Sequence, residues 1–313
     1  MTSLSLAKAG LLSNNKLVQG IVAEILAVDA FSKVLPFVTV EGKALTYNRS
    51  LNTADTAAWY SVGDTVNKTP ASITQITANF GRIVADAEVD ALEELTMSEV
   101  TDQMQAQIEE KSRAIGRLWK QGIITGTGTG GQIEGINTLC DNSQTLDIAT
   151  TSSSSITFAG LEQLLGKVTA KDGQVDFMMM NSAMLRDYRA LVRETAGGVE
   201  TMELGFIDPV TGRRGSLTVN SFNGIPIFAN DYIGTETLAT VHTGVTRIYA
   251  GCFGEGVGLT GFIPARMDKL IEISPLIYHQ DRDSVYRRLR LIAGLALYST
   301  KALAQWIKVK AAS

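Results

Sequence analysis

Three glycines of the chain have the spacing of a dinucleotide-binding loop. Gly126, Gly128 and Gly131 match the pattern G-x-G-x-x-G, in which glycines let the backbone approach a pyrophosphate. Such a site needs a strand before the glycines and a cofactor-binding helix after them. Here a long helical pattern precedes them, and the segment 133–139 that follows is too short for that helix. We therefore interpret the glycines as a flexible connector.

The residue types that carry acid–base, nucleophilic and metal chemistry are few and scattered. His242 and His279 are the only histidines, and neither has a second ligand at metal-site spacing. Glu93 and Glu94 are adjacent, so they point to different faces of the predicted helix and make a poor acid–base pair. No G-x-S-x-G motif is present, and Cys140 is better explained as a buried thiol than as a nucleophile. The sequence therefore predicts no enzyme, no cofactor and no metal site.

Charge and cysteine content narrow the class of protein further. The 313 residues include 28 basic and 32 acidic ones, so the chain lacks the positive excess of proteins that grip nucleic acid tightly. Charged residues make up 19%, against about 25% in typical soluble chains. Either the surface is unusually poor in charge, or partners cover much of it. The two cysteines cannot make a disulfide framework, which favours a reducing cytoplasm.

Neither the N-terminus nor any apolar run has the character of a targeting or membrane segment. Residues 1–12 mix polar residues into their apolar ones, unlike a signal peptide. The longest apolar run, 291–298, is far shorter than the roughly 20 residues that cross a bilayer. These features predict a soluble chain that is not exported.

The N-terminal third predicts an arm followed by a long hairpin. Residues 1–33 carry one helical pattern, and strands are predicted at 38–47 and 74–80. The connection between the strands, 48–72, exceeds the roughly 12–15 residues that compact domains usually allow in a loop. A loop of this length, with Trp59 and Tyr60 in it, is expected to contact a partner.

A long helix is predicted over 85–121, because apolar residues follow three- and four-residue spacings there. Acidic residues gather near its start and basic residues toward its end, as the helix macrodipole favours. At about 1.5 Å per residue, the helix would be on the order of 50 Å long. It would span a domain and leave its ends free to touch neighbours.

The rest of the chain has an α/β pattern. Helices are predicted at 158–169 and 181–194, the second capped by Asn181, and a long loop at 195–215. The predicted strands are 175–180, 217–219, 225–229, 247–250, 258–262, 270–274, 285–298 and 306–310.

The strand 285–298 is exceptionally long and carries three arginines. Alternation places Arg287 on the face opposite Arg288 and Arg290, which dilutes any phosphate-binding patch. Salt bridges between subunits are the preferred interpretation of these arginines.

Several segments, taken in order, resemble the major capsid proteins of tailed bacteriophages, which have the Hong Kong 97-like fold. The resemblance covers essentially the whole chain. "NGIPIFAND" at 223–231 is its most specific piece, similar to the G-x-P-[VI] strand of that family. The other matching segments are "GTGTGGQIEGI" at 126–136, "FMMMNSAMLRDYRALV" at 177–192, "RIYAGCF", "KLIEIS" and the closing "YRRLRLIAGLALYSTKALAQWIKVK".

The resemblance implies an α+β fold, the Hong Kong 97-like capsid fold. It has an N-terminal arm, an extended β-hairpin loop, a peripheral domain with a long spine helix, and an axial α/β domain. The implied ranges are 1–35 for the arm, 36–84 for the extended loop, 85–150 with 264–300 for the peripheral domain, and 151–263 with 301–313 for the axial domain.

The function implied by the resemblance is structural. Pentamers and hexamers of the chain would assemble in the host cytoplasm into an icosahedral shell around packaged double-stranded DNA, which they would touch weakly and without specificity. About 35 residues precede the hairpin, too few for the fused scaffolding segment of some relatives. The resemblance therefore implies a separate scaffolding protein or a segment removed before this sequence begins, and Met1 favours the former. A portal and a cement protein are further expected partners. The alternatives are an encapsulin nanocompartment that encloses protein cargo and, from another class, an α/β enzyme.

The resemblance also implies where subunits touch. Contacts are expected in the hairpin and at a turn between the closing strands, near threefold axes. The expected contact residues are Trp59, Tyr60 and Lys68 in the hairpin and His279, Asp281, Arg282 and Asp283 in the turn.

Overall fold

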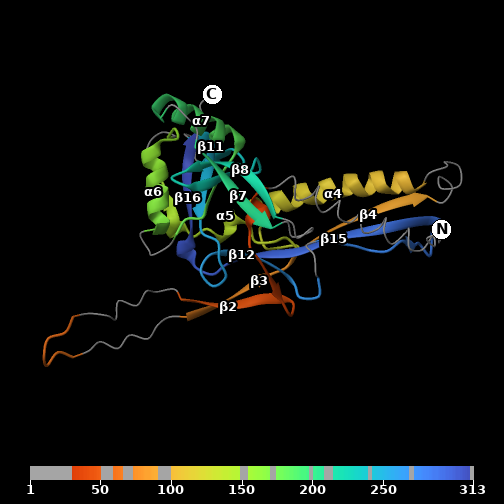
Figure 1. Ribbon diagram of the computed structural model, residues 1–313. Helices are drawn as coiled ribbons and strands as arrows, with labels where there is room; N and C mark the ends of the chain where they lie inside the picture. Colours follow the sequence, from red (N-terminus) through yellow and green to blue (C-terminus); the bar gives the residue numbers. More distant parts are fainter. Residues whose placement is uncertain are drawn as a thin grey trace.

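The structure is a computed structural model, in which the chain forms an elongated part and a more compact part (Figure 1). It describes residues 30–50, 59–65, 73–90, 100–148, 154–169, 174–196, 200–207, 214–238, 242–267 and 271–310. The predicted helical pattern within 1–29 lies outside the described residues.

The elongated part is a sheet with one long helix along it. Its elements are α2 (Ala30–Val34), β1 (Phe37–Val40), β4 (Gly81–Asp90), α4 (Val100–Thr125), β12 (Leu259–Pro264), β13 (Ile271–Ile273), β14 (Ile277–Tyr278) and β15 (Ser284–Leu297). A separate two-stranded ribbon consists of β2 (Ala44–Ser50) and β3 (Ile73–Asn79).

The compact part is a second sheet with helices against it. Its helices are α5 (Ile136–Leu139), α6 (Phe158–Thr169), α7 (Ser182–Ala196) and the short 3-10 turns η1 (Asn142–Gln144) and η2 (Thr300–Ala302). Its strands are β5 (Thr145–Leu146), β6 (Phe177–Met180), β7 (Thr201–Ile207), β8 (Arg214–Phe222), β9 (Ile225–Ala229), β10 (Glu236–Leu238), β11 (His242–Gly251) and β16 (Leu303–Lys310).

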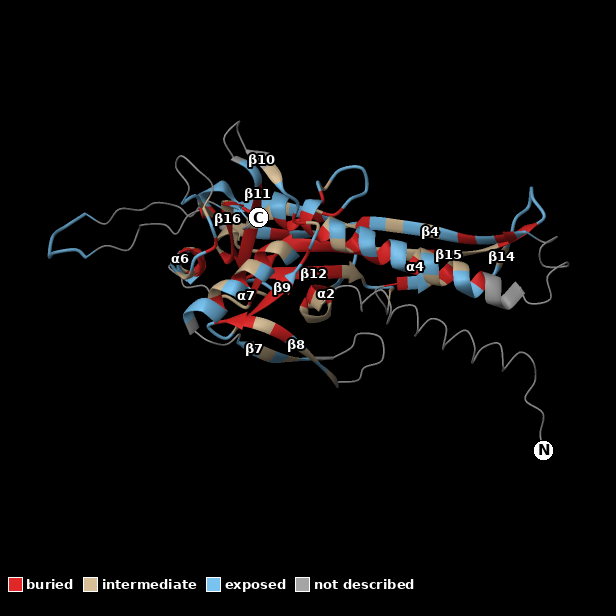
Figure 2. Ribbon diagram, turned by 90° about the horizontal axis from the view of Figure 1, so that it is seen from above, coloured by how far each residue is buried: buried red, intermediate tan, exposed pale blue. Residues whose placement is uncertain are grey.

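β15 organises the elongated part. It pairs with β4 along ten residues on one side and with β12, β13 and β14 on the other. The alternation predicted for this strand is confirmed between Leu289 and Ala293, where Leu289, Leu291 and Ala293 are buried, but the last five residues, 293–297, are buried on both faces. α4 runs lengthwise along β4 and β15 in both views (Figures 1 and 2) and buries Ile115 and Trp119.

The predicted helix 85–121 begins too early. Residues 81–90 form strand β4, and the described helix runs from Val100 to Thr125. Burial alternates with a period of two, which is typical of a strand rather than a helix. Ala87 and Val89 are buried in the core, whereas the alternating residues Asp86 and Glu88 are exposed. Because the helix ends at Thr125, its last turn has no basic residue.

Two of the three arginines of β15 pair within the subunit, whereas salt bridges between subunits are the expectation from the sequence. Both Nε and Nη2 of Arg288 donate to the carboxylate of Asp86 at 2.8 Å. Arg290 lies 3.9 Å from the carboxylate of Glu272. These partners stand on neighbouring strands, in the register that pairs Arg288 with Asp86 and Arg290 with Glu272.

The predicted hairpin is present, but its first strand begins later than predicted. β2 and β3 pair antiparallel from Ala44↔Asn79 to Ser50↔Ile73, so a long hairpin exists. The residues just before it form β1, which instead pairs in parallel with β12 of the main sheet. The hairpin therefore emerges from a strand that is fixed in the core sheet.

In the compact part most predicted elements are confirmed. α6 and β9 have the predicted bounds, and the Met184 amide donates to Asn181 Oδ1 at 2.8 Å, as expected for a helix cap. The loop predicted at 195–215 is wrong, because β7 and β8 form an antiparallel pair there. The alternating Met202 and Leu204 pack against the core and were the signal for this strand.

The glycine segment is a connector, as predicted. It follows α4 rather than a strand, and the helix after it, α5, has only four residues. Gly128, Gly130 and Gly131 have positive φ, which lets the chain turn back so that Thr127 pairs with Glu134. This geometry excludes the cofactor helix of a dinucleotide site.

A close approach between α6 and β16 gives a first prediction. A Cβ at Gly160 would lie 2.3 Å from Trp306 Cη2, and the Trp306 side chain is fully buried. We expect Gly160→Ala to lower the free energy of unfolding by about 1–3 kcal/mol, because the core is overpacked. Gly166→Ala in the same helix meets nothing within 4 Å and should raise it by about 0.5–1 kcal/mol. Urea unfolding of the unassembled subunit measures both, and a stabilising Gly160→Ala would contradict the packing described here.

The pair of Asp86 and Arg288 predicts an acid-sensitive contribution to stability. The hydrogen bonds from Arg288 lower the pKa of Asp86 below its ordinary value. The pair therefore stabilises the fold above the unfolded-state pKa of Asp86, and this contribution is lost as the pH falls through the folded value. Asp86→Asn should be less stable than the natural chain at pH 7, by a small amount because the pair is partly exposed.

The stabilities of Asp86→Asn and the natural chain should converge as the pH falls through the lowered pKa of Asp86. Urea midpoints measured from pH 7 to pH 2.5 test this, with Glu272→Gln as a control whose carboxylate lies farther from its arginine. A difference between Asp86→Asn and the natural chain that stays constant across this range would contradict it.

Candidate functional site

The end of the hairpin presents apolar side chains to solvent. We call residues 59–65 the hairpin tip; it extends well beyond the compact body (Figure 1). Trp59 and Val62 are fully exposed, and Tyr60 is 39% exposed. The Ser61 amide donates to Asp64 Oδ2 at 2.7 Å, which shapes the turn. A fully exposed indole is unusual on a free surface, because burying such a side chain is strongly favourable.

The root of the same hairpin is held firmly in the body. Tyr47 Oη donates to the carbonyl of Leu297 at 2.9 Å, and Arg49 donates to the carbonyls of Leu297 and Tyr298. The rings of Tyr47 and Tyr298 lie 4.8 Å apart, and Ala78 is buried beside them. Lys68, the third expected contact in the hairpin, lies outside the described residues. The root of the hairpin is thus anchored on the body, and the hairpin tip exposes apolar side chains.

A second exposed surface lies at the far end of the elongated part. We call residues 278–283 the distal turn; it joins β14 to β15. Asp281, Arg282 and Asp283 are exposed and, among the described residues, have no hydrogen bond or ion pair. Tyr278 is 72% exposed. The turn offers both signs of charge and an aromatic ring to a neighbour.

His279, at the start of this turn, has contacts within the subunit. Its Nε2 lies 3.8 Å from Glu88 Oε1, and its ring lies 4.5 Å from that of Tyr286. Its backbone amide also donates to the carbonyl of Ser284. His279 therefore fixes the base of the distal turn, whereas Arg282 projects from it.

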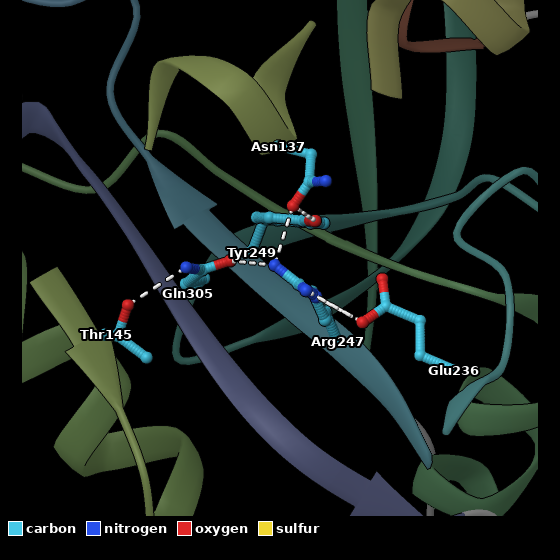
Figure 3. Close-up of polar contacts among 6 residues, drawn as sticks. All are labelled: Asn137, Thr145, Glu236, Arg247, Tyr249 and Gln305. Carbon is cyan, nitrogen blue, oxygen red and sulfur yellow. Dashed lines mark hydrogen bonds and ion pairs between the residues drawn. The ribbon is translucent and has the colours of Figure 1, made fainter. Parts of the chain in front are cut away.

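A polar cluster ties β10 to the rest of the compact part (Figure 3). Sequence patterns did not predict this cluster. Arg247 donates through Nε and Nη2 to Glu236, at 3.2 and 2.7 Å. Its Nη1 donates to Asn137 at 2.7 Å and to Gln305 at 3.1 Å. Tyr249 Oη also donates to Asn137, at 3.3 Å. The guanidinium of Arg247, on β11, thus links α5, β10 and β16. Arg247 and Asn137 are 110 positions apart in the sequence.

The groups that could do chemistry are not assembled for it. Burial, helped by the charge of Asp141, raises the pKa of Cys140 to about 12, and burial also raises the pKa of Cys252. Both thiols are therefore unreactive at neutral pH. His242 starts β11 and His279 lies at the distal turn, so they serve no common site.

A cleft beside the glycine connector has little chemistry in its lining. This cleft, of about 400 Å³, lies between β4, the end of α4 and the glycine connector, and Arg82 is its one titratable lining residue. The described residues contain no group of three or more metal-binding side chains. Among the described helices, none has the length and apolar character that a membrane span requires.

Comparisons with known proteins give a family and a fold. The chain matches the phage capsid family over residues 9–305. The SrpI encapsulin of Synechococcus elongatus PCC 7942 is similar in structure, with a TM-score of 0.67 and 13% identity over 90% of this chain and 88% of that chain. The capsid of a native GTA particle has a TM-score of 0.60 and 14% identity over 90% of each chain. The Gordonia phage Cozz structure has a TM-score of 0.56 and 14% identity over 91% and 87%.

At these identities the solved structures establish the fold alone, and they confirm the α+β capsid fold expected from the sequence. No curated protein sequence matches the chain. The family match covers most of the chain, and this family consists of structural shell proteins rather than enzymes. The chain belongs to the phage capsid family and is a shell-forming major capsid protein.

Proposed function

We propose that pentamers and hexamers of this chain close into an icosahedral shell around packaged double-stranded DNA, through contacts made by the hairpin tip and the distal turn. The observation that carries this proposal is the hairpin: its root is hydrogen-bonded into the body, and its tip exposes Trp59 and Val62 completely. A subunit that remained a monomer would gain no stability from a hairpin whose tip exposes two large apolar side chains.

The proposed domains follow the two sheets. The arm is 1–35, the extended loop 36–84, the peripheral domain 85–150 with 264–300, and the axial domain 151–263 with 301–313. The grouping of β4, β13, β14 and β15 in one sheet and of β6 to β11 and β16 in the other supports this division. β12 (Leu259–Pro264) departs from this division, because the range 151–263 puts it in the axial domain while it pairs with β15 of the elongated part.

Assembly is proposed to take place in the host cytoplasm, with a separate scaffolding protein, a portal and a cement protein as partners. An encapsulin-type shell with protein cargo is the second candidate, favoured by the likeness to the SrpI encapsulin. Purified particles separate the two: nuclease-protected DNA inside them supports the capsid, and a protein cargo without DNA supports the encapsulin.

The hairpin tip gives a direct test of assembly. A buried tryptophan at an interface commonly contributes about 2 kcal/mol or more, roughly 30-fold in one contact equilibrium. We expect Trp59→Ser with Val62→Ser to abolish or greatly reduce closed shells while the subunit stays folded. Particle yield by negative-stain microscopy and subunit folding by circular dichroism measure the two effects.

The matched control for this variant is Val257→Ser, which removes an exposed apolar side chain from a turn outside the hairpin. It should assemble normally. Unchanged shell yield and heat resistance in the Trp59/Val62 variant would show that the tip is not an assembly contact.

The distal turn predicts ion pairs between subunits. Arg282 has no acidic partner among the described residues of its own subunit, so we propose that it pairs with a carboxylate of a neighbour, with Asp281 and Asp283 receiving the reciprocal arginine. Such pairs are partly desolvated and contribute more than exposed ones. Arg282→Ala should produce shells that dissociate at lower temperature and lower salt.

Arg193→Ala, which removes an exposed arginine of α7, serves as the control and should leave the shells unchanged. Light scattering during heating, at two salt concentrations, measures both variants. Shells of Arg282→Ala with the heat and salt resistance of the natural chain would rule out this role.

A further inference from the structure

The exposed apolar side chains of the hairpin tip have a counterpart elsewhere on the same chain. Val84 of β4 is 39% exposed, and Leu118 of α4 is 54% exposed. Both side chains line the cleft of about 400 Å³ between β4, the end of α4 and the glycine connector. We call this hollow the connector cleft. Apolar side chains left in water around a hollow are typical of a surface that binds another protein.

The lining of the connector cleft suits an apolar side chain. Trp119 and Leu291 are buried, so they form its floor. Gly130 and Gly131 are exposed, and a Cβ on either glycine would meet no atom within 4 Å, so no side chain narrows the mouth. The apolar side chains of the lining are Ile83, Val84, Leu118, Trp119, Ile133 and Leu291.

The charges of the connector cleft and of the hairpin tip are opposite. Arg82, the one titratable residue of the lining, is exposed and has no ion pair with any described residue. Asp64 is the one charged residue of the hairpin tip. Its carboxylate accepts a hydrogen bond from the Ser61 amide and has no cationic partner among the described residues. Opposite charges beside an apolar contact steer two surfaces together and fix their orientation.

The hairpin tip of one subunit does not reach the connector cleft of that same subunit. The hairpin leads away from α4 and β4 in both views (Figures 1 and 2). Its root is hydrogen-bonded to the carbonyls of Leu297 and Tyr298, which fixes where it leaves the body. A single chain therefore leaves both the tip and the cleft uncovered, and a second copy offers each of them its complement.

We propose that the hairpin tip of one subunit is seated in the connector cleft of a neighbouring subunit. Trp59 would bury its indole against Val84 and Leu118, and Asp64 would lie toward Arg82. This inference rests on the proposed function and names the surface that receives the tip. The volume of the cleft, about 400 Å³, lies within the roughly 300–1,000 Å³ of pockets that hold drug-sized ligands, so an indole fits. The contact joins two different surfaces of identical chains, which is the kind that closes subunits into rings.

The N-terminal arm is the other candidate occupant of the cleft, and its charge suits the cleft less well. Residues 1–23 contain Lys8 and Lys16 and no Asp or Glu. Like charges that face each other across a contact are unfavourable, and Arg82 is the charge that the cleft presents. The hairpin tip, which carries Asp64, is therefore the better match.

Photocrosslinking from the hairpin tip tests the proposal. Trp59 is replaced by the photoreactive p-benzoylphenylalanine, which keeps a large aromatic side chain, and the natural chain is mixed in excess so that shells form. Irradiation should link the tip to residues 81–84, 118–126 or 130–133 of a neighbour, identified by peptide mass spectrometry. The same replacement at Val257, an exposed side chain outside the hairpin, is the control and should not label these segments. Adducts from position 59 only to other segments, residues 1–29 included, would overturn the proposal.

Charge reversal provides a second readout. Arg82→Glu and Asp64→Lys should each raise, several-fold, the subunit concentration at which half of the chain assembles, because each puts like charges at the contact. The chain with both changes has opposite charges again and should assemble at a lower concentration than either single variant. Arg193→Glu makes the same charge change on α7 and should leave assembly unchanged. Unchanged assembly of Arg82→Glu, or losses that simply add in the combined chain, would contradict the inference.

These outcomes are separate from those of the proposed function. If the natural chain forms no closed shell, the proposed function fails. If shells form, and Trp59→Ser with Val62→Ser prevents them, but position 59 crosslinks away from the cleft, the tip is still an assembly contact and only the present inference fails.

Discussion

The fold depends on the pairing of one buried strand. β15 is fourteen residues long and hydrogen-bonds to β4 on one side and to β12, β13 and β14 on the other. The backbone at its end, Leu297 and Tyr298, also accepts the hydrogen bonds that anchor the hairpin root. A two-stranded hairpin would be marginal on its own in water. The hairpin and the distal turn, which protrude from the body, are both attached directly to this strand.

This arrangement separates the groups that hold the subunit from those left for partners. The carboxylate of Asp86 and the guanidinium of Arg247 find their partners within the chain. The hairpin tip and the distal turn instead carry an indole and three charged side chains that no described residue covers. Because the body is already well packed, burying those side chains against neighbouring subunits can add stability to an assembly without altering the subunit. This is the physical basis on which a capsid subunit can stay folded before it assembles.

Local pattern predicted much of the fold. The alternation of β15, the bounds of α6 and the Asn181 cap all follow from near neighbours in sequence. The predicted start of the long helix was wrong. The spacing of apolar residues before residue 91 also suits a helix, but residues 81–90 pair with a strand two hundred positions away. Separation along the chain also hid the partners of Arg288 and Arg247: Asp86 lies 202 positions from Arg288, and Asn137 lies 110 positions from Arg247. Trp59 and Arg282 could be named in advance as expected contact residues, and both are exposed in the subunit. The residues of a neighbouring subunit that they would meet cannot be read from local sequence patterns.

A cryo-electron microscopy reconstruction of particles assembled from the natural chain tests the central claim most directly. We expect a closed shell in which the hairpin tip of each subunit is buried on a neighbour and Trp59 is no longer exposed. We also expect that β15 and the hairpin root keep the contacts described here. A closed shell in which Trp59 and the distal turn remain in solvent would contradict the account, because assembly would then depend on other surfaces.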